Sequence, residues 1–255
     1  MNKREDSRKV GLARALSKLG YCSRSQAARL IRAGRVSANG AKRSDPESPV
    51  NLQRDRIEVD GQMVQAKAKT YLVLNKPRGV VTTASDERGR DTVYSCLSES
   101  LSWISPVGRL DKASEGLLLL TNDSEWAAGV TDPAAHLDKT YHVQVNVMAD
   151  QTLVAALSRG VTLEDGEFLR AREARLLRSG SRNSWIEIIL DEGKNRQIRR
   201  MLERLNVDVL RLVRVAIGPL LLGELAKGQS RPLTTEEKRA IDQAMRDFRG
   251  ASPEL

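Results

Sequence analysis

The chain has 255 residues, of which 40% are hydrophobic, and this is enough to form one large domain and one small domain. Its net charge of +9 comes from 42 lysines and arginines against 33 acidic residues, which favours a polyanionic partner. No apolar run is as long as the roughly 18 residues that a membrane-spanning helix needs. Two cysteines are too few for a disulfide framework. The amino terminus lacks a signal-peptide pattern, so we expect a reduced, cytoplasmic protein.

The positive charge is most one-sided near the amino terminus, where we expect residues 1–10 to form a basic tail. Residues 7–44 contain ten basic residues and no acidic residue. Such a segment repels itself unless a phosphate backbone supplies the opposite charge. A solvated structural surface is the alternative interpretation of the same residues.

Two helices are predicted within residues 11–34. The first has leucines at helical spacing: Leu12, Leu16 and Leu19. Gly20 fits its end, and Ser23 with Gln26 forms the capping-box pattern that opens a second helix. The apolar face of the second helix holds Ala27, Leu30 and Ile31. Arginines lie on its other side and just beyond it: Arg24, Arg29, Arg32 and Arg35.

An Asn39–Gly40 hairpin turn and a short strand at residues 57–59 follow the helices. With the string from Ser23 to Ile31, this pattern over residues 11–60 resembles the S-four type RNA-binding domain. The resemblance implies that the four arginines around the second helix contact phosphates of structured RNA. We expect residues 61–69 to be a linker.

Residues 70–235 are predicted to form the larger domain. Its expected strands are residues 71–74, 141–147, 185–190, 209–213 and 217–222, and a helix is expected to follow Asn195. Strands and helices do not alternate regularly, so the pattern indicates an α+β domain on a mixed, mostly antiparallel sheet. A charged helix at residues 236–248 is expected within the carboxyl-terminal segment, 236–255, to which we assign no function.

The stretch from Gly108 to Asp123 carries the most informative residue. Asp111 precedes a glycine and four consecutive leucines, the pattern of a fully buried strand. A carboxylate at the mouth of such a strand has a rigid support, although a polar turn is the simpler interpretation. The whole string resembles the nucleophile motif of the pseudouridine synthases, in the branch that modifies ribosomal RNA. Ser114 stands where that family usually has threonine, and it keeps the hydroxyl.

Three further segments resemble motifs of the same family, in the same order along the chain. They are residues 75–80, residues 139–141, and residues 193–201 with Ile217–Gly218–Pro219 and Leu225. The reaction breaks a carbon–nitrogen glycosidic bond, turns the uracil and rejoins it through carbon. It requires no redox change and no group donor, so we expect no cofactor and no metal.

The resemblance assigns a role to each candidate residue. Asp111 is the catalytic carboxylate, which either attacks the sugar or removes its 2′ proton. Arg199 keeps Asp111 ionised, and Tyr141 packs on the base. Arg109 fills the gap left by the flipped nucleotide, and Leu225 walls the uracil pocket. Lys76 and Arg196 are expected to bind RNA.

The predicted function is therefore the isomerisation of a uridine in ribosomal RNA by a monomer that binds rRNA or a ribosome-assembly intermediate and no membrane. Two alternatives remain open: a non-catalytic assembly factor, and a synthase acting on tRNA. Asp123 is a possible second carboxylate, but it follows the buried strand and should point away from Asp111. The sequence does not decide between the small and the large ribosomal subunit.

Overall fold

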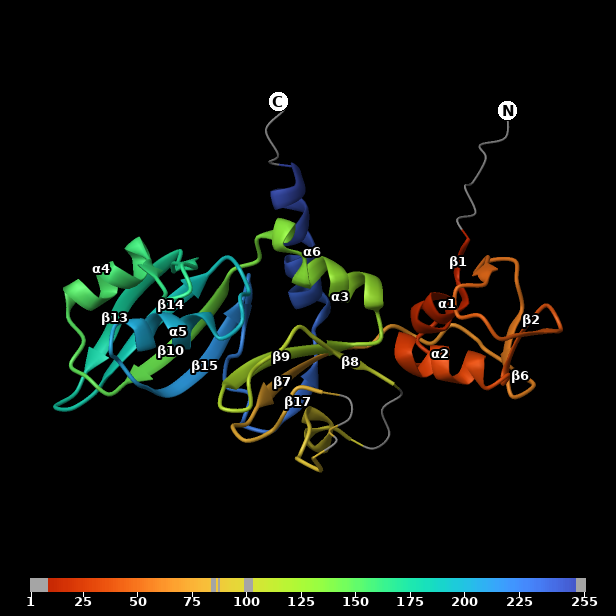
Figure 1. The fold of residues 1–255 in the computed structure, drawn as a ribbon, viewed down its shortest axis with the longest axis horizontal. Coiled ribbons are helices and arrows are strands. Elements are labelled where there is room, and N and C mark those ends of the chain that lie inside the picture. The colour runs from red at the N-terminus through yellow and green to blue at the C-terminus, as the bar shows by residue number, and fades with distance from the viewer. Residues whose placement is uncertain (1–8, 84–85, 87, 99–102, 251–255) are drawn as a thin grey trace. The chain divides into compact units, whose positions relative to one another are not determined.

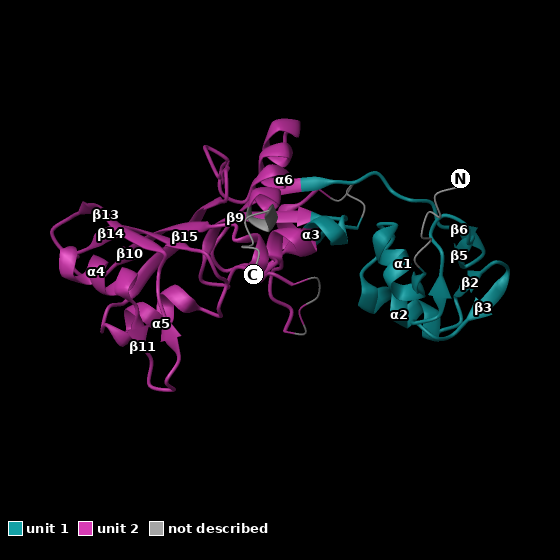
Figure 2. Cartoon of the chain, turned by 90° about the horizontal axis from the view of Figure 1, so that it is seen from above, with its two compact units in different colours: residues 1–71, 99–105, 121–126 teal, residues 72–98, 106–120, 127–255 magenta. Residues whose placement is uncertain are grey.

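The computed structural model describes residues 9–83, 86, 88–98 and 103–250, and the chain divides into two compact units (Figure 2). The smaller unit comprises residues 1–71, 99–105 and 121–126, and the larger unit comprises the remainder. Of the basic tail expected at residues 1–10, only residues 9 and 10 are described, and residues 251–255 also lie outside the described chain.

The smaller unit packs two helices against short antiparallel strands. Its elements are β1 (Val10–Gly11), α1 (Leu12–Lys18), α2 (Arg24–Arg32), β2 (Val36–Ala38), β3 (Ala41–Arg43), β4 (Pro49–Val50), β5 (Ile57–Val59) and β6 (Gln62–Met63). Strands β3-β2-β5-β6 form one sheet, and β1 pairs with β4. Both halves of the capping box at Ser23 and Gln26 are present, and Ala27 and Ile31 are buried. The predicted helices are therefore confirmed.

Two tight turns set the hairpins of this sheet. Asn39 and Gly40 have φ of 54° and 78°, as the predicted turn requires, and Asp60 and Gly61 repeat the pair at 51° and 78°. The second turn brings β6 back onto β5, and Val64 packs into the core of this unit. The linker expected at residues 61–69 is therefore wrong at its start, because residues 61–64 belong to the small fold.

The larger unit is built on a mixed sheet with strand order β13-β14-β10-β15-β9-β7-β17, to which β8 and β16 attach at β9 and β15 (Figure 1). Its strands are β7 (Tyr71–Lys76), β8 (Ser105–Val107), β9 (Glu115–Thr121), β10 (Lys139–Val145), β13 (Glu173–Ser179), β14 (Ser184–Leu190), β15 (Val209–Ile217), β16 (Leu220–Leu221) and β17 (Ser230–Pro232). Strand β9 runs parallel to β15, whereas β10 is antiparallel to both β14 and β15. The predicted mixed, mostly antiparallel sheet is confirmed.

Four helices accompany the sheet: α3 (Ser124–Thr131), α4 (Gln151–Arg159), α5 (Gln197–Arg204) and α6 (Thr235–Gly250). The short elements are η1 (Val93–Cys96), η2 (Pro133–Ala135), and the paired strands β11 (Val161–Thr162) and β12 (Phe168–Leu169). Helices α4 and α5 share one hydrophobic core with β10 and β14 (Figure 1). Helix α6 confirms the charged helix expected in the carboxyl-terminal segment, and its Ile241 is fully buried.

The parallel pair of β9 and β15 depends on a glycine. Gly116 lies opposite Arg214 with φ of 102°, and a Cβ atom there would stand 2.2 Å from the Arg214 carbonyl oxygen. No side chain fits at that distance, and L-residues avoid that φ. Because Leu117 to Leu120 are fully buried just after it, this contact fixes the strand that follows Asp111.

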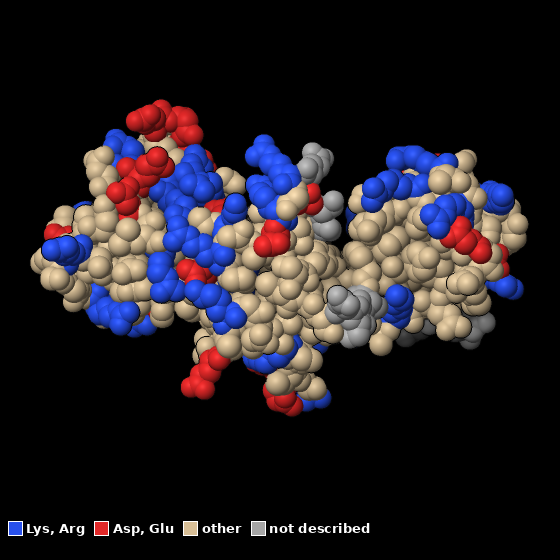
Figure 3. All heavy atoms as spheres, turned by 90° about the horizontal axis from the view of Figure 1, so that it is seen from below, with Lys and Arg blue, Asp and Glu red and all other residues tan. Residues whose placement is uncertain are grey.

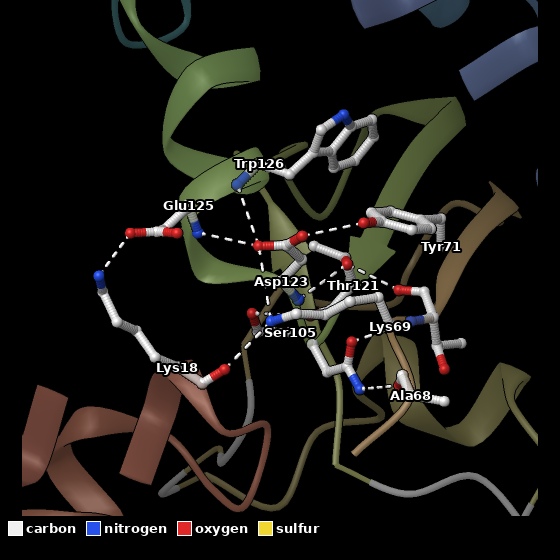
Figure 4. A network of polar contacts seen from close by, with 11 residues as sticks. Lys18, Ala68, Lys69, Tyr71, Ser105, Thr121, Asp123, Glu125 and Trp126 are labelled. Atoms are coloured by element: carbon white, nitrogen blue, oxygen red, sulfur yellow. Dashed lines mark hydrogen bonds and ion pairs between the residues drawn. The ribbon is translucent and has the colours of Figure 1, made fainter. Parts of the chain in front are cut away.

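Asp123 lies at the other end of β9, in a polar network of the smaller unit (Figure 4). Its carboxylate accepts hydrogen bonds from the Tyr71 hydroxyl at 2.9 Å and from the backbone N–H groups of Glu125 and Trp126. Burial alone would raise the pKa of Asp123, but these hydrogen bonds outweigh it and leave the pKa lowered. Asp123 thus stabilises the beginning of α3.

Candidate active site

The larger unit contains a cavity of about 670 Å³ at the entrance to β9. Its wall includes Asp111 from the loop before β9, Tyr141 from β10, and Arg196, which is the residue immediately before α5. Five cationic side chains face three carboxylates around it, so the wall carries a net positive charge. The cations are Arg109, Lys139, Lys194, Arg196 and Arg214, and the carboxylates are Asp111, Asp191 and Glu192. Asp123 is not among the lining residues.

Hydrogen bonds from the buried side chain of Lys76 hold the loop that carries Asp111. This side chain is 0% exposed, and its Nζ donates hydrogen bonds to the carbonyl oxygens of Pro77 at 3.1 Å, Asp111 at 3.1 Å and Ser114 at 2.9 Å. Burial lowers the pKa of Lys76 to about 8. The expectation that Lys76 binds RNA is wrong, because the ammonium group is enclosed and all three of its protons have acceptors.

Hydrogen bonds on both sides of Asp111 complete this support. The Ser114 N–H donates to the Asp111 carbonyl oxygen at 3.0 Å, and the Gly79 N–H donates to Lys112 O at 2.8 Å. The Thr82 hydroxyl donates to Leu110 O at 2.7 Å. The backbone is therefore fixed while the carboxylate, with 34% of its side chain exposed, is free to meet a ligand.

Two arginines of the 193–201 segment approach this loop in different ways. Arg196 Nη1 lies 3.9 Å from Asp111 Oδ2, and its backbone has φ of 49° at the residue before α5. Arg199 Nη2 instead donates to the Ala113 carbonyl oxygen at 3.1 Å, while its Nε is buried without a hydrogen-bond partner among the described residues. Burial and then the charge of Arg196 lower the pKa of Arg199, although Asp111 acts in the opposite direction.

The arginine that pairs with Asp111 is therefore not the one that the sequence predicted. The sequence assigned the ion pair with Asp111 to Arg199, but Arg196 is the cation within 4 Å of that carboxylate among the described residues. Arg199 braces the loop through Ala113 and does not line the cavity. The physical reason is the left-handed turn at Arg196, which directs its side chain towards the cavity entrance.

The remaining predicted site residues divide in the same way. Tyr141 is half-buried, packs on the hydrophobic core and lines the cavity. Arg109 is exposed and also lines the cavity. Leu225 does not line it, so its expected role as a pocket wall is wrong. Its carbonyl oxygen accepts a hydrogen bond from Asn75 Nδ2 at 2.7 Å, which holds this loop against β7. Leu190, Leu212 and Ile217 provide apolar wall instead.

Lys139 and Arg214 are cavity residues that sequence reasoning missed. Lys139 had a usable signal, because it stands two positions before Tyr141 in a strand and therefore shares its face. Arg214 had none, since nothing in its neighbourhood distinguishes it from an ordinary strand arginine. Its burial follows only from the pairing of β15 with β9.

In the smaller unit, Arg24, Arg29 and Arg32 are exposed along α2. Arg35 is also exposed, but its guanidinium donates to both carboxylate oxygens of Asp60, at 2.9 Å and 2.5 Å. This pair lowers the pKa of Asp60 through the hydrogen bond from Arg35. Arg35 is thus paired, whereas the other three arginines form no ion pair with any residue that the structure describes.

Metal ligands do not gather anywhere in the described residues: no group of three or more His, Cys, Asp or Glu side chains is placed to hold an ion. The helices within the described ranges are also too short or too polar to cross a membrane. Figure 3 shows one face of the molecule, on which lysines and arginines gather in a band across the larger unit, with acidic side chains beside it.

Comparisons with known proteins identify the family of this chain. The family model for RNA pseudouridylate synthase matches residues 70–204, and the S4 domain model matches residues 10–57. Ribosomal large subunit pseudouridine synthase B of Bacillus subtilis is 36% identical over 90% of this chain and 94% of its own length. An uncharacterized RNA pseudouridine synthase of Aquifex aeolicus is 36% identical over 92% and 95%. A crystal structure of a pseudouridylate synthase has a TM-score of 0.65 at 30% identity, covering 91% of this chain and 99% of that one. The chain belongs to the RNA pseudouridylate synthase family.

Proposed function

We propose that this enzyme converts a specific uridine of large-subunit ribosomal RNA into pseudouridine. The observation that carries the proposal is Asp111, held by the buried Lys76 at the edge of a cavity that Tyr141 also lines. The Bacillus subtilis relative is named for the large ribosomal subunit, which supports that choice of substrate. The S4 domain and the net positive charge support an RNA substrate.

Asp111 supplies the carboxylate for the first step. It either attacks C1′ of the target nucleotide or removes the 2′ proton, and in both cases the C1′–N1 bond breaks. The step requires an ionised and correctly placed carboxylate. Arg196 Nη1 is a cation 3.9 Å from that carboxylate, and the three hydrogen bonds from Lys76 to carbonyl oxygens keep the loop in place.

A base stacked inside an RNA helix cannot reach Asp111, so the target nucleotide must turn out into the cavity. Arg109, exposed at the cavity wall, then occupies the gap in the helix. Tyr141 packs on the uracil, with the apolar side chains of the wall around the ring. A cavity of about 670 Å³ is within the range that accepts a nucleoside-sized ligand.

The arginines of α2 hold the RNA by its phosphates. Arg24, Arg29 and Arg32 have exposed side chains and give attraction without base recognition. Sequence selection then depends on which uridine can be presented to the cavity.

The test is a map of pseudouridines in both ribosomal RNAs from cells that lack this protein. We expect one large-subunit position to remain uridine and to be restored by the wild-type gene but not by Asp111→Asn. Loss of a position in small-subunit rRNA or tRNA would contradict the substrate. A complete pseudouridine map with defective ribosome assembly would favour a non-catalytic assembly factor.

A further inference from the structure

Arg214 is a buried cation that lines the cavity. The residue is 6% exposed, and its Nε donates to the Leu117 carbonyl oxygen at 2.8 Å. Its Nη2 is buried and has no hydrogen-bond partner among the residues that the structure describes. A buried N–H without an acceptor is unfavourable, and a ligand that supplies an acceptor relieves that cost.

The backbone around Arg214 is rigid and irregular. Thr140 of β10 lies opposite Ala216, but Tyr141 lies opposite Arg214, so Val215 is an extra residue in β15. Such a bulge redirects the side chains beside it. On the other side, Gly116 lies so close to the Arg214 backbone that a Cβ atom would not fit between them. Arg214 is therefore held in place before any ligand binds.

Lys139 is the second cation of this corner of the cavity. Its Nζ makes no hydrogen bond or ion pair with any other described residue, and it lines the cavity on the same strand face as Tyr141. Burial and then the charge of Arg214 lower the pKa of Lys139, while Asp138 and Asp191 act in the opposite direction. Asp138 is already paired with Arg172 at 2.7 Å, and Asp191 lines the same cavity.

We propose that Arg214 and Lys139 bind the carbonyl oxygens of the target uracil and stabilise its negative charge when the glycosidic bond breaks. This inference rests on the proposed function. Both electrons of the C1′–N1 bond pass to N1, and the charge spreads over the ring nitrogen and the carbonyl oxygens. C1′ forms a bond to an Asp111 oxygen or, after loss of the 2′ proton, a double bond to C2′. C5 then attacks C1′ and forms the new carbon–carbon bond as the Asp111 oxygen departs or, in the other route, as C2′ regains its proton. The C5 proton is lost to a base, and N1 takes up a proton.

The surroundings of the two cations favour a ring over a phosphate group. Leu190, Leu212 and Ile217 line the same cavity, and apolar walls suit the faces of a uracil. Arg214 is almost wholly enclosed, whereas RNA phosphates are met by exposed cations such as Arg109. Donors placed where charge develops in the transition state are the usual means by which enzymes speed such a bond cleavage.

The test measures the single-turnover rate and the RNA affinity of Lys139→Met and Arg214→Lys, with Arg159→Met as the control. Arg159 is exposed at the end of α4 and lies outside the cavity, so its loss removes one charge only. We expect Lys139→Met to lower the rate about 100-fold while RNA affinity changes by less than about threefold. Arg214→Lys, which keeps the charge, should retain more activity than Arg214→Met.

A second substrate separates leaving-group stabilisation from a structural role. Fluorine at C5 makes the departing ring less basic, so the Lys139→Met defect should shrink when RNA containing 5-fluorouridine is consumed. An equal defect with both substrates, or lost affinity with an unchanged rate at saturation, would overturn the proposal. If the wild type turns over and Lys139→Met equals it, this inference alone fails. If the wild type turns over no ribosomal RNA, the proposed function fails.

Discussion

Replacing Lys76 with methionine tests how the catalytic loop is held. Methionine fills a similar volume but removes the Nζ group that bonds Pro77, Asp111 and Ser114. Three hydrogen bonds from a charged donor at about 1.5 kcal/mol each slightly outweigh the cost of burying that charge. The cost follows from the pKa, since the difference between the ordinary 10.5 and about 8 corresponds to about 3 kcal/mol. We expect Lys76→Met to lower the free energy of unfolding by about 1–2 kcal/mol at pH 7.

The same pKa predicts how that loss changes with pH. Between pH 8 and 10.5 the unfolded chain still binds the Lys76 proton that the folded protein has released, so stability rises with pH. Below pH 8 both states are protonated and this contribution is constant. The difference in unfolding free energy between wild type and Lys76→Met should therefore grow to about 4 kcal/mol near pH 10.

The assay is urea unfolding followed by circular dichroism from pH 7 to 10, for wild type, Lys76→Met and the exposed-site control Lys112→Met. The control should keep the pH dependence of the wild type, because Lys76 is intact in it. The turnover of Lys76→Met should also fall by about 100-fold, the cost of displacing a reacting group by about 1 Å. A difference in unfolding free energy that is independent of pH would refute the reasoning.

Three further sets of substitutions test the site, the sheet and the RNA surface. Arg196→Ala should slow single turnover by less than about fivefold, because its pair with Asp111 is long and half-exposed. Arg199→Ala should slow it by at least about 30-fold, because it leaves the half-buried Ala113 carbonyl oxygen without its donor and frees the loop. Equal effects of the two changes would contradict this assignment. Gly116→Ala should abolish the folded state, as seen by loss of cooperative unfolding, because its Cβ would overlap the Arg214 backbone. Charge removal on α2 should reduce the salt dependence of rRNA binding by about one unit of slope per arginine, and an unchanged slope would mean a solvated surface. The α2 variants are Arg24→Ala, Arg29→Ala and Arg32→Ala.

Features set by neighbouring residues were predictable from the sequence. The Ser23–Gln26 capping box and the Asn39–Gly40 turn act within a few residues, and both are present. The buried strand before Asp123 was also predicted, because four consecutive leucines leave no polar face. The fold class of the larger domain followed from the irregular alternation of its strands and helices, but periodicity alone does not order strands within a sheet.

Features that depend on distant pairings were not predictable. Lys76 was expected to bind RNA because its acceptors, Asp111 and Ser114, lie 35 and 38 residues away along the chain. Arg196, rather than Arg199, lies beside the Asp111 carboxylate because the residue before α5 has a left-handed backbone. Arg214 gains its position from a bulge and from Gly116 on another strand. Each of these errors concerns where a long cationic side chain ends, which spacing along the chain does not determine.

The most direct test of the account is the reaction of Asp111→Asn with ribosomal RNA labelled with tritium at carbon 5 of uridine. The change keeps the size of the side chain and removes its charge, so tritium release should be undetectable while RNA affinity stays close to that of the wild type. Asp123→Asn is the matched control, because it removes a carboxylate at the far end of β9 that does not line the cavity. If it folds, it should still release tritium. Normal release by Asp111→Asn would contradict the central claim that this carboxylate performs the chemistry.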